Sequence, residues 1–182
     1  MGVVLNFVAA TTAESERPLP GDDLVPDPDI TMDRAFDLAG SPEQVWPWLV
    51  QLGKQRAGWY LPRSIERFLP KSRRATRKIE ARWQGLKAGD VIPDYGGKHE
   101  TFETVDVRHN QWIVYKSVRG ATRMSWSLSI ESRPDGSSRV QARLRLAPVK
   151  HRRIVASAGE FFDLLTIAGM AAGLRERVSS PQ

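Results

Sequence analysis

Cysteine is absent from this chain of 182 residues, and histidine is scarce. Without cysteine the chain has no disulfide, no thiolate nucleophile and no thiolate metal ligand, as is common in a reducing compartment. The three histidines, His99, His109 and His151, are scattered, and no cluster has the spacing of a zinc site. A glycine-rich phosphate loop and a nucleophile-elbow serine are also missing. We therefore expect no metal, no cofactor and no catalytic residue of a familiar motif.

Long apolar runs are missing as well. The longest, residues 161–174, contains Asp163 and is shorter than the about 20 residues that a transmembrane helix needs. The apolar N-terminus, residues 1–10, lacks a basic start and is shorter than most signal sequences. We read no export signal, and the sequence predicts a cytoplasmic protein.

Positive charge is in excess, with a formal net charge of +6, which suits anionic partners. The densest basic segment, residues 71–82, lacks an apolar period and predicts an exposed, mobile loop or a frayed helix. Its basic residues are Lys71, Arg73, Arg74, Arg77, Lys78 and Arg82. A solvated loop is the preferred interpretation, since no aromatic interleaving supports base recognition. We expect no nucleic acid as partner, and weak contact with an anionic membrane surface stays open.

The first 29 residues predict an extended N-terminal arm. Pro18, Pro20, Pro26 and Pro28 fix the local backbone and exclude regular helix, while several aspartates make the arm acidic. The arm is either disordered or wrapped around the basic domain, and the opposite charges favour docking.

A strand and two short helices are expected next. Residues 30–38 predict the strand. Ser41 and Gln44 form a capping box with Pro42 at the first helical position, and Gly53 is a plausible stop. Pro47 predicts a bend in this helix. A second short helix is expected over residues 62–69.

The second half of the chain predicts an antiparallel sheet. Strand-like runs cover residues 91–92, 101–107, 112–118, 121–133 and 137–146, with turn residues between the last four. In the last two runs apolar and polar residues alternate strictly. Such alternation is typical of a sheet with one covered face and one face in water.

A long final helix is expected to begin at a second capping box, Ser157 to Glu160. It is apolar around nearly its whole circumference up to Arg175, which predicts burial on all sides. Small residues between Ala168 and Gly173 indicate close approach by the sheet or by a ligand.

This order of elements predicts an α+β helix-grip fold: a curved antiparallel sheet wrapped around a long C-terminal helix, with two short helices after the first strand. The single domain covers residues 30–178, and residues 179–182 form a tail.

Four segments resemble the START-related (SRPBCC) superfamily of polyketide cyclases/dehydrases and lipid-transport proteins. They are residues 18–23, 41–53, 58–60 and 86–93. The resemblance extends from about residue 18 to about residue 175 and implies a central cavity between the concave sheet face and the final helix. It does not decide between activities, since this fold hosts carriers, cyclases and ligand sensors.

We therefore expect the chain to bind a small hydrophobic or amphipathic molecule, lipid- or polyketide-like, as a carrier or sensor. Pockets for such ligands are mostly apolar, with a few placed polar groups. The candidate wall residues are Trp59, Tyr60, Trp112, Tyr115, Met124, Trp126, Phe162 and Leu165. Each of them is also a plausible ordinary core residue.

The alternative is an enzyme, a cyclase or dehydratase acting on a polyketide-like substrate in the same cavity. Such chemistry needs a group that moves protons and one that stabilises an enolate. The polar candidates are Glu66, Asp94, Tyr95, His99, Glu100 and Arg123, none of which forms a diagnostic pair. The sequence therefore favours a binding protein over an enzyme, and it leaves the oligomeric state open.

Overall fold

The computed structural model describes residues 8–150 and 152–179. Residues 1–7 of the expected arm, His151 and residues 180–182 of the tail lie outside the described part. Six antiparallel strands form one sheet in the order β1-β6-β5-β4-β3-β2. They are β1 (Ile30–Leu38), β2 (Val91–Pro93), β3 (Thr101–Arg108), β4 (Trp112–Arg119), β5 (Thr122–Ser132) and β6 (Ser138–Ala147). The helices are α1 (Thr12–Glu16), α2 (Pro42–Gln51), α3 (Arg63–Glu66) and α4 (Arg152–Val178).

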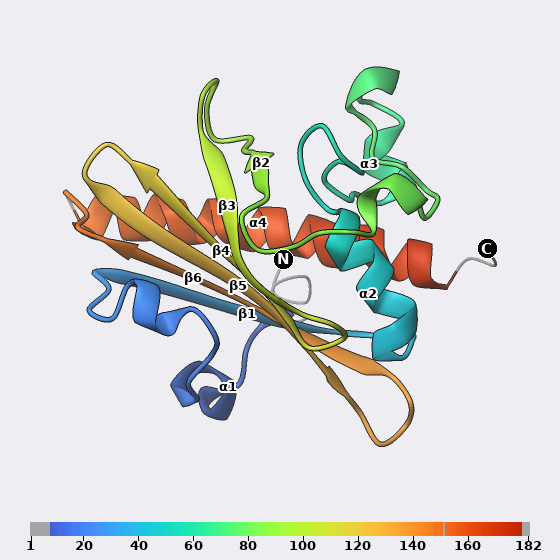
Figure 1. The fold of residues 1–182 in the computed structure, drawn as a ribbon, viewed down its shortest axis with the longest axis horizontal. Coiled ribbons are helices and arrows are strands. Elements are labelled where there is room, and N and C mark those ends of the chain that lie inside the picture. The colour runs from blue at the N-terminus through green and yellow to red at the C-terminus, as the bar shows by residue number, and fades with distance from the viewer. Residues whose placement is uncertain (1–7, 151, 180–182) are drawn as a thin grey trace.

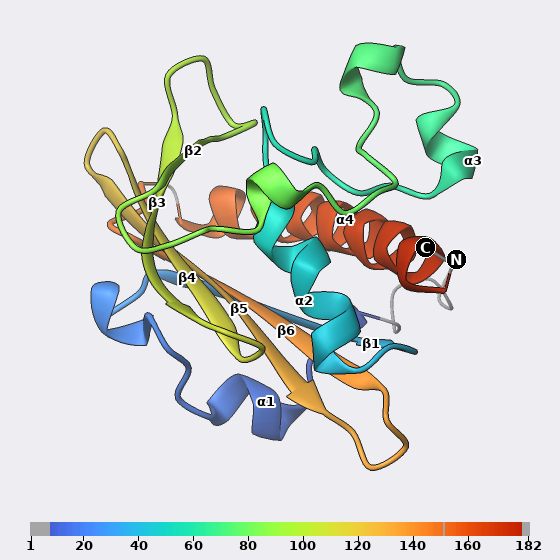
Figure 2. The same cartoon turned by 45° about the vertical axis from the view of Figure 1, so that its right-hand side comes forward.

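The sheet curves around α4, so the predicted helix-grip fold is confirmed. Helices α2 and α4 lie on one side of the sheet and α1 lies on the other (Figures 1 and 2). The apolar residues of β1, β5 and β6 share the face toward α4, because residues paired across antiparallel strands point to the same side. Phe36 opposite Val140 and Trp126 opposite Leu144 are two such pairs.

The two short helices are confirmed as well. Helix α2 begins with the predicted capping box, in which the Ser41 backbone N–H donates to Gln44 Oε1 at 2.9 Å. It continues through Pro47 and buries Trp48 and Leu49 in the core. Tyr60 lies fully buried beside it and donates its hydroxyl to the Trp48 carbonyl at 2.8 Å.

The prediction for the start of α4 was wrong. The helix begins at Arg152, so residues 157–160 lie inside it and do not cap it. Burial on all sides was also wrong, since Phe162 is 69% exposed and Leu165 is 53% exposed. The strong burial lies nearer the C-terminus, where Met170, Ala171 and Leu174 are buried in the core. The sequence shows which faces of the helix are apolar. Which of these faces are buried depends on where the sheet lies against the helix.

Within the predicted stretch of small residues in α4, Gly169 and Gly173 approach neither the sheet nor a ligand. A Cβ at Gly173 would lie 2.6 Å from the Leu61 backbone nitrogen and 2.6 Å from the Tyr60 carbonyl carbon. A Cβ at Gly169 would meet the Leu61 side chain at 2.7 Å. The glycines therefore let the connection between α2 and α3 pass directly over the helix.

The outer face of the sheet is covered over the middle of β5 and β6, which corrects the prediction of a face in water. Arm segments after Val8 pack across this part, and Ser125, Ser127 and Arg143 are each less than 5% exposed. Arg143 donates to Asp33 and Asp22, each at 2.8 Å, and to backbone carbonyls of the arm. The alternating polar residues were predicted to face water. Instead, they form hydrogen bonds and ion pairs with the arm that covers them.

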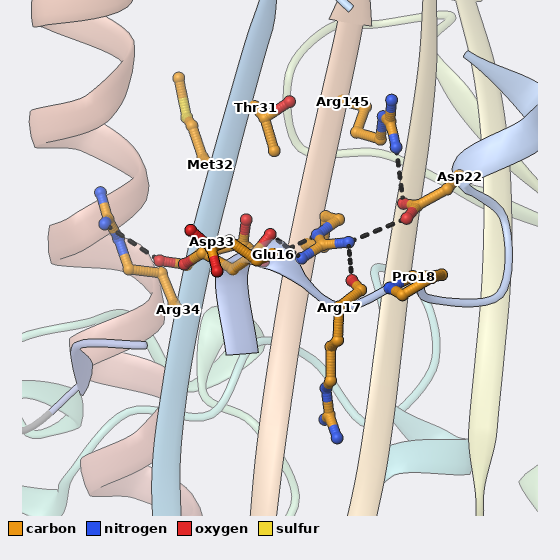
Figure 3. Close-up of a pocket in the computed structure, with 11 residues that line it drawn as sticks. Glu16, Arg17, Pro18, Asp22, Thr31, Met32, Asp33, Arg34 and Arg145 are labelled. Atoms are coloured by element: carbon orange, nitrogen blue, oxygen red, sulfur yellow. Dashed lines mark hydrogen bonds and ion pairs between the residues drawn. The ribbon is translucent and has the colours of Figure 1, made fainter. Parts of the chain in front are cut away.

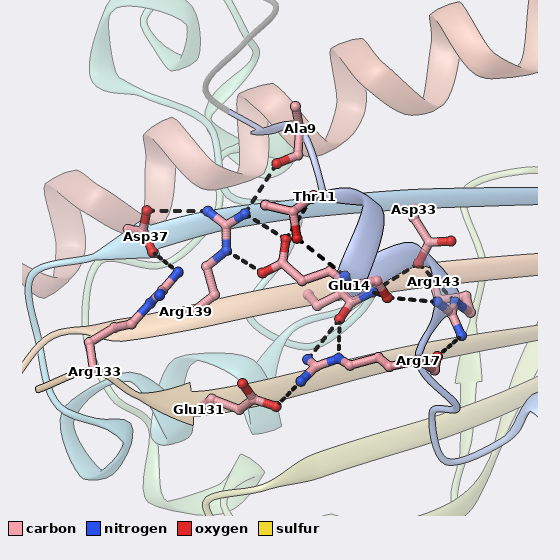
Figure 4. A network of polar contacts seen from close by, with 11 residues as sticks. Ala9, Thr11, Glu14, Arg17, Asp33, Asp37, Glu131, Arg133, Arg139 and Arg143 are labelled. Atoms are coloured by element: carbon pink, nitrogen blue, oxygen red, sulfur yellow. Dashed lines mark hydrogen bonds and ion pairs between the residues drawn. The ribbon is translucent and has the colours of Figure 1, made fainter.

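Inside the arm, the prolines did not exclude helix throughout. Helix α1 occupies Thr12–Glu16, ahead of Pro18, and begins with a capping box between Thr11 and Glu14. Glu14 then reaches β6 and pairs with Arg139 at 2.8 Å (Figure 4). Next to it, Arg17 donates to Gln141 Oε1 at 2.7 Å and pairs with Glu131. Docking by opposite charge, the preferred alternative, is thus what the structure shows.

Residues 71–82 form an irregular segment with 3-10 turns at Lys71–Arg73 and Ala81–Trp83, and the frayed-helix alternative was wrong. Arg77 anchors the segment by pairing with Glu66 at 2.6 Å and with Glu176 at 3.1 Å. Glu66 also accepts from Arg177, whose side chain is fully buried, at 2.7 Å. Burial opposes ionisation of Glu66, yet the bonds from Arg177 and Arg77 lower the pKa of its carboxyl.

The contact between Glu14 and Arg139 predicts a pH dependence of folding. The hydrogen bond from Arg139, opposed by burial, lowers the pKa of Glu14 from 4.5 to about 2. The ionised carboxylate therefore stabilises the fold above pH 4.5, and this contribution is lost as the pH falls toward about 2. We expect Glu14→Gln to lower the free energy of unfolding at neutral pH and to converge with wild type over that window.

Urea unfolding at a series of pH values measures this difference. The control is Glu103→Gln, which removes a carboxylate from an exposed pair with Lys116 and should change little at any pH. A Glu14→Gln deficit that stayed constant down to pH 2 would contradict the assignment.

The cluster around Arg177 predicts a large effect of one carboxylate. Glu66→Ala leaves the buried guanidinium without its carboxylate and should cost about 3 kcal/mol of unfolding free energy. Glu80→Ala removes an exposed partner of Arg82 and should cost at most about 0.5 kcal/mol. Equal losses of unfolding free energy in the two variants, measured with urea, would contradict this. They would show that the backbone carbonyls around Arg177 satisfy its guanidinium without Glu66.

Candidate functional site

A cavity of about 460 Å³ lies between the concave face of the sheet, the N-terminal half of α4 and the loop after β2. Its wall is predominantly apolar and includes side chains from β1, β3, β5, β6 and α4. The apolar and aromatic wall residues are Met32, Trp59, Tyr95, Phe102, Met124, Trp126, Leu144, Leu146, Phe162 and Ile167. The volume falls in the range of small-molecule sites in proteins.

Aromatic rings form one side of this cavity. Trp126 stacks on Trp59 with ring centroids 6.0 Å apart, and Phe102 lies 5.7 Å from Trp126. The indole nitrogen of Trp59 donates to the Thr166 carbonyl of α4 at 3.2 Å, which fixes the ring. A wall of oriented aromatic faces favours a flat or unsaturated apolar ligand, because such faces stack on π-systems as well as excluding water.

Charged groups gather at one rim. Asp94, in the loop after β2, forms an ion pair with Arg119 at the end of β4. Glu100 lies 3.8 Å from the same guanidinium, which also sits 5.5 Å above the Phe102 ring. Tyr95 is half-exposed beside them, and burial raises the pKa of its phenol. A ligand with one polar end could place that end here while its apolar part enters the cavity.

A second ion pair borders the cavity deeper in the fold. Asp163 of α4 lies on the wall and pairs with Arg34 of β1 at 3.0 Å. Both side chains are at least 85% buried. Thr166, one turn farther along α4, turns its hydroxyl to the helix carbonyls of Phe162 and Asp163. These polar groups of the wall thus bond to other groups of the protein.

Of the eight residues predicted from the sequence, the structure brings four together on the cavity wall: Trp59, Met124, Trp126 and Phe162. Their role in binding stays a prediction. The remaining four lie elsewhere. Tyr60 is in the core beside α2, and Tyr115 is buried behind Trp126, with ring centroids 5.4 Å apart.

Trp112 and Leu165 also lie away from the wall. Trp112 shares the outer face with Ser129, and its indole donates to Asp106 at 2.6 Å. Leu165 is exposed on α4. In a strand, Trp112 and Tyr115 point to opposite faces. The pairing with β5 shows that Tyr115 shares the concave face with Trp126, whereas Trp112 lies on the other face.

The polar candidates separate in the same way. Asp94 and Tyr95 lie on the cavity wall, and Glu100 lies close to Arg119 at the rim. His99 and Arg123 are exposed, and neither belongs to the wall. Glu66 is far from the cavity, in the cluster with Arg177, where its role is structural. Within residues 8–150 and 152–179, no group of three metal-ligating side chains is placed to hold an ion.

Several wall residues were not among the predicted ones. Leu144 and Leu146 belong to β6, whose alternation had been recognised, so its inward face was the signal that could have found them. Met32 of β1 lies on the wall because it pairs with Leu144. Phe102 and Asp163 carried no such signal. Their positions follow from the pairing of β3 with β2 and from the placement of α4.

A more polar pocket of about 640 Å³ lies where the arm crosses β1 and β6 (Figure 3). Its cations are already engaged: Arg143 bonds to Asp33 and Asp22, and Arg145 pairs with Asp22 at 3.0 Å. These contacts hold the arm to the sheet. The apolar cavity is therefore the candidate functional site.

Comparison with protein-family models and with curated protein sequences finds no match. Solved structures do match. A protein from Rhodobacter sphaeroides is 12% identical, with a TM-score of 0.55 over 85% of this chain and 95% of that chain. An Hsp90 activator from Plasmodium falciparum is 10% identical, with a TM-score of 0.54 over 84% of this chain and 98% of that chain.

A third similar structure is DynU16, a protein of the dynemicin biosynthetic locus. It is 9% identical, with a TM-score of 0.52 over 84% of this chain and 48% of that chain. At such identities the likeness is one of fold and not of activity. The chain shares its fold with these proteins, and it is the helix-grip fold that the sequence predicted.

Proposed function

We propose that this protein binds a small apolar or amphipathic molecule in the cavity between the sheet and α4, as a carrier or sensor. The observation that carries the proposal is the cavity itself, with its aromatic wall of Trp59, Phe102 and Trp126. A well-packed interior leaves few voids larger than a water molecule, so a space of about 460 Å³ with an apolar lining is a feature that needs an explanation.

The distribution of charge supports an amphipathic ligand. Inside, the wall consists of aliphatic and aromatic side chains, which favour hydrocarbon or a fused ring system. At the rim, Asp94 and Arg119 form an ion pair that a polar ligand group could join. Lipid-like and polyketide-like molecules both combine these two properties. We place this activity in the cytoplasm, as the sequence led us to expect.

An enzyme is the second candidate, and one observation favours it. Two carboxylates, Asp94 and Asp163, lie on the wall of an otherwise apolar cavity, where a carboxylate could take a proton from a bound substrate. Both already hold an arginine, Asp94 with Arg119 and Asp163 with Arg34. Because these contacts engage the oxygens of both carboxylates, the arrangement favours binding over proton transfer.

Filling the cavity tests the proposed function. Leu144 is partly exposed on the wall, so Leu144→Trp places a larger side chain in the space. We expect it to weaken binding of N-phenyl-1-naphthylamine, an uncharged fluorescent probe, by about tenfold or more. The matched control is Val118→Trp, which adds the same ring at an exposed position and should leave the affinity unchanged.

Thermal unfolding must show that both variants are folded. Probe binding that is absent in the wild type, or equal in both variants, would refute a ligand site in this cavity.

Turnover separates the two candidates. We expect wild type to bind an aromatic poly-β-ketone without converting it, as followed by mass spectrometry. Conversion that is lost in both Asp94→Asn and Asp163→Asn, with probe binding retained, would replace the carrier proposal with the enzyme.

A further inference from the structure

The segment that follows α2 projects away from the body of the protein. In both views, α3 and the turn after it stand apart from the sheet (Figures 1 and 2). The segment is held at its base, where Arg77 and Arg177 bond to Glu66 and the Arg63 backbone N–H donates to Glu176 at 3.0 Å. Its outer residues, 63–74, form the surface that we name the α3 tip.

Large apolar side chains are exposed on the α3 tip. Phe68 is 76% exposed and Ile65 is 47% exposed. Phe68 has one described ring contact, with the guanidinium of Arg67 at 4.6 Å. An aromatic ring this exposed gains nothing for the fold, and its burial against a partner would be favourable.

The charge around Phe68 has one sign. Arg63, Arg67, Lys71 and Arg73 are all exposed, and none of their side chains has a carboxylate partner among the described residues. Arg74 donates to the carbonyls of Leu69 and Arg67 and so fixes the turn. The single acid of the tip, Glu66, is buried and committed to Arg177. The surface presented to a partner is thus basic and apolar together.

An anionic membrane surface matches this combination. Each basic side chain close to anionic lipid contributes about 1 kcal/mol, and apolar side chains between them insert at the level of the headgroups. A nucleic acid would use the cations and could stack on Phe68, but it offers nothing to the aliphatic Ile65. No helix in the described part of the chain is long and apolar enough to cross a bilayer, so the contact would be peripheral.

We propose that the α3 tip docks this protein onto anionic membrane surfaces, with Phe68 and Ile65 inserted and the surrounding cations against lipid headgroups. The cavity and its mouth are built by other residues, from the loop after β2 and the N-terminal half of α4. The docking surface therefore stands apart from the proposed ligand site, and either function can fail without the other.

Vesicle sedimentation with the full chain tests the docking. We expect binding to phosphatidylcholine vesicles that contain phosphatidylserine, and none to phosphatidylcholine alone. Phe68→Ala should weaken the partition coefficient by about tenfold. The double variant Lys71→Ala/Arg73→Ala should weaken it by about twentyfold, and the wild-type affinity should fall as salt is raised.

The controls remove side chains of the same kind, apolar or cationic, at exposed positions outside the tip. Val118→Ala removes an exposed apolar side chain, and Lys87→Ala/Arg123→Ala removes two exposed cations. Both should bind vesicles as wild type does. N-phenyl-1-naphthylamine binding should be unchanged in all four variants, which separates this result from the fate of the proposed function.

Three results would overturn the docking proposal. One is the absence of binding to phosphatidylserine vesicles. Another is equal weakening by the tip and control charge variants, which would indicate a response to net charge alone. The last is binding to duplex DNA in a mobility assay that is tighter than binding to the vesicles and is unchanged by Phe68→Ala. That result would indicate that the tip is a nucleic-acid surface.

Discussion

The packing of α4 against the concave face of the sheet is the contact from which the rest of the structure follows. Toward its C-terminus the helix buries Met170, Ala171 and Leu174 in the core, where side chains fill the space. Toward its N-terminus the sheet curves away, and Trp59 and Trp126 line a cavity instead. One helix thus serves as a core element at one end and as a cavity wall at the other.

The opposite face of the sheet obeys a different constraint. Its polar side chains would be solvated in an open sheet, but the arm covers them, and each buried charge then requires a partner. Arg143 satisfies this requirement by bonding to Asp33, Asp22 and three arm carbonyls. Since neither the arm nor the arginines can be buried alone at low cost, the acidic arm and the basic strand β6 depend on each other.

The basic charge of the protein divides into two classes through its contacts. One class of arginines pairs with carboxylates within the protein and contributes to stability. It includes Arg139, Arg143 and Arg177. Those of the α3 tip, such as Arg67 and Arg73, are exposed without a carboxylate partner among the described residues. Net charge alone does not distinguish the two, and the proposed membrane contact rests on the second class only.

By itself, the sequence determined the elements and their order: the capping box at Ser41, the alternation in β5 and β6, and the apolar C-terminal helix each specify local structure through short-range contacts. Half of the predicted wall residues reached the cavity, because spacing reveals which residues share a face but not which face is concave. The tertiary structure decided that the polar face is buried under the arm, and that Gly173 admits the backbone at Leu61 and not a ligand. It also placed Asp163 on the cavity wall. These outcomes depend on register and on contacts between distant segments, which no local pattern encodes.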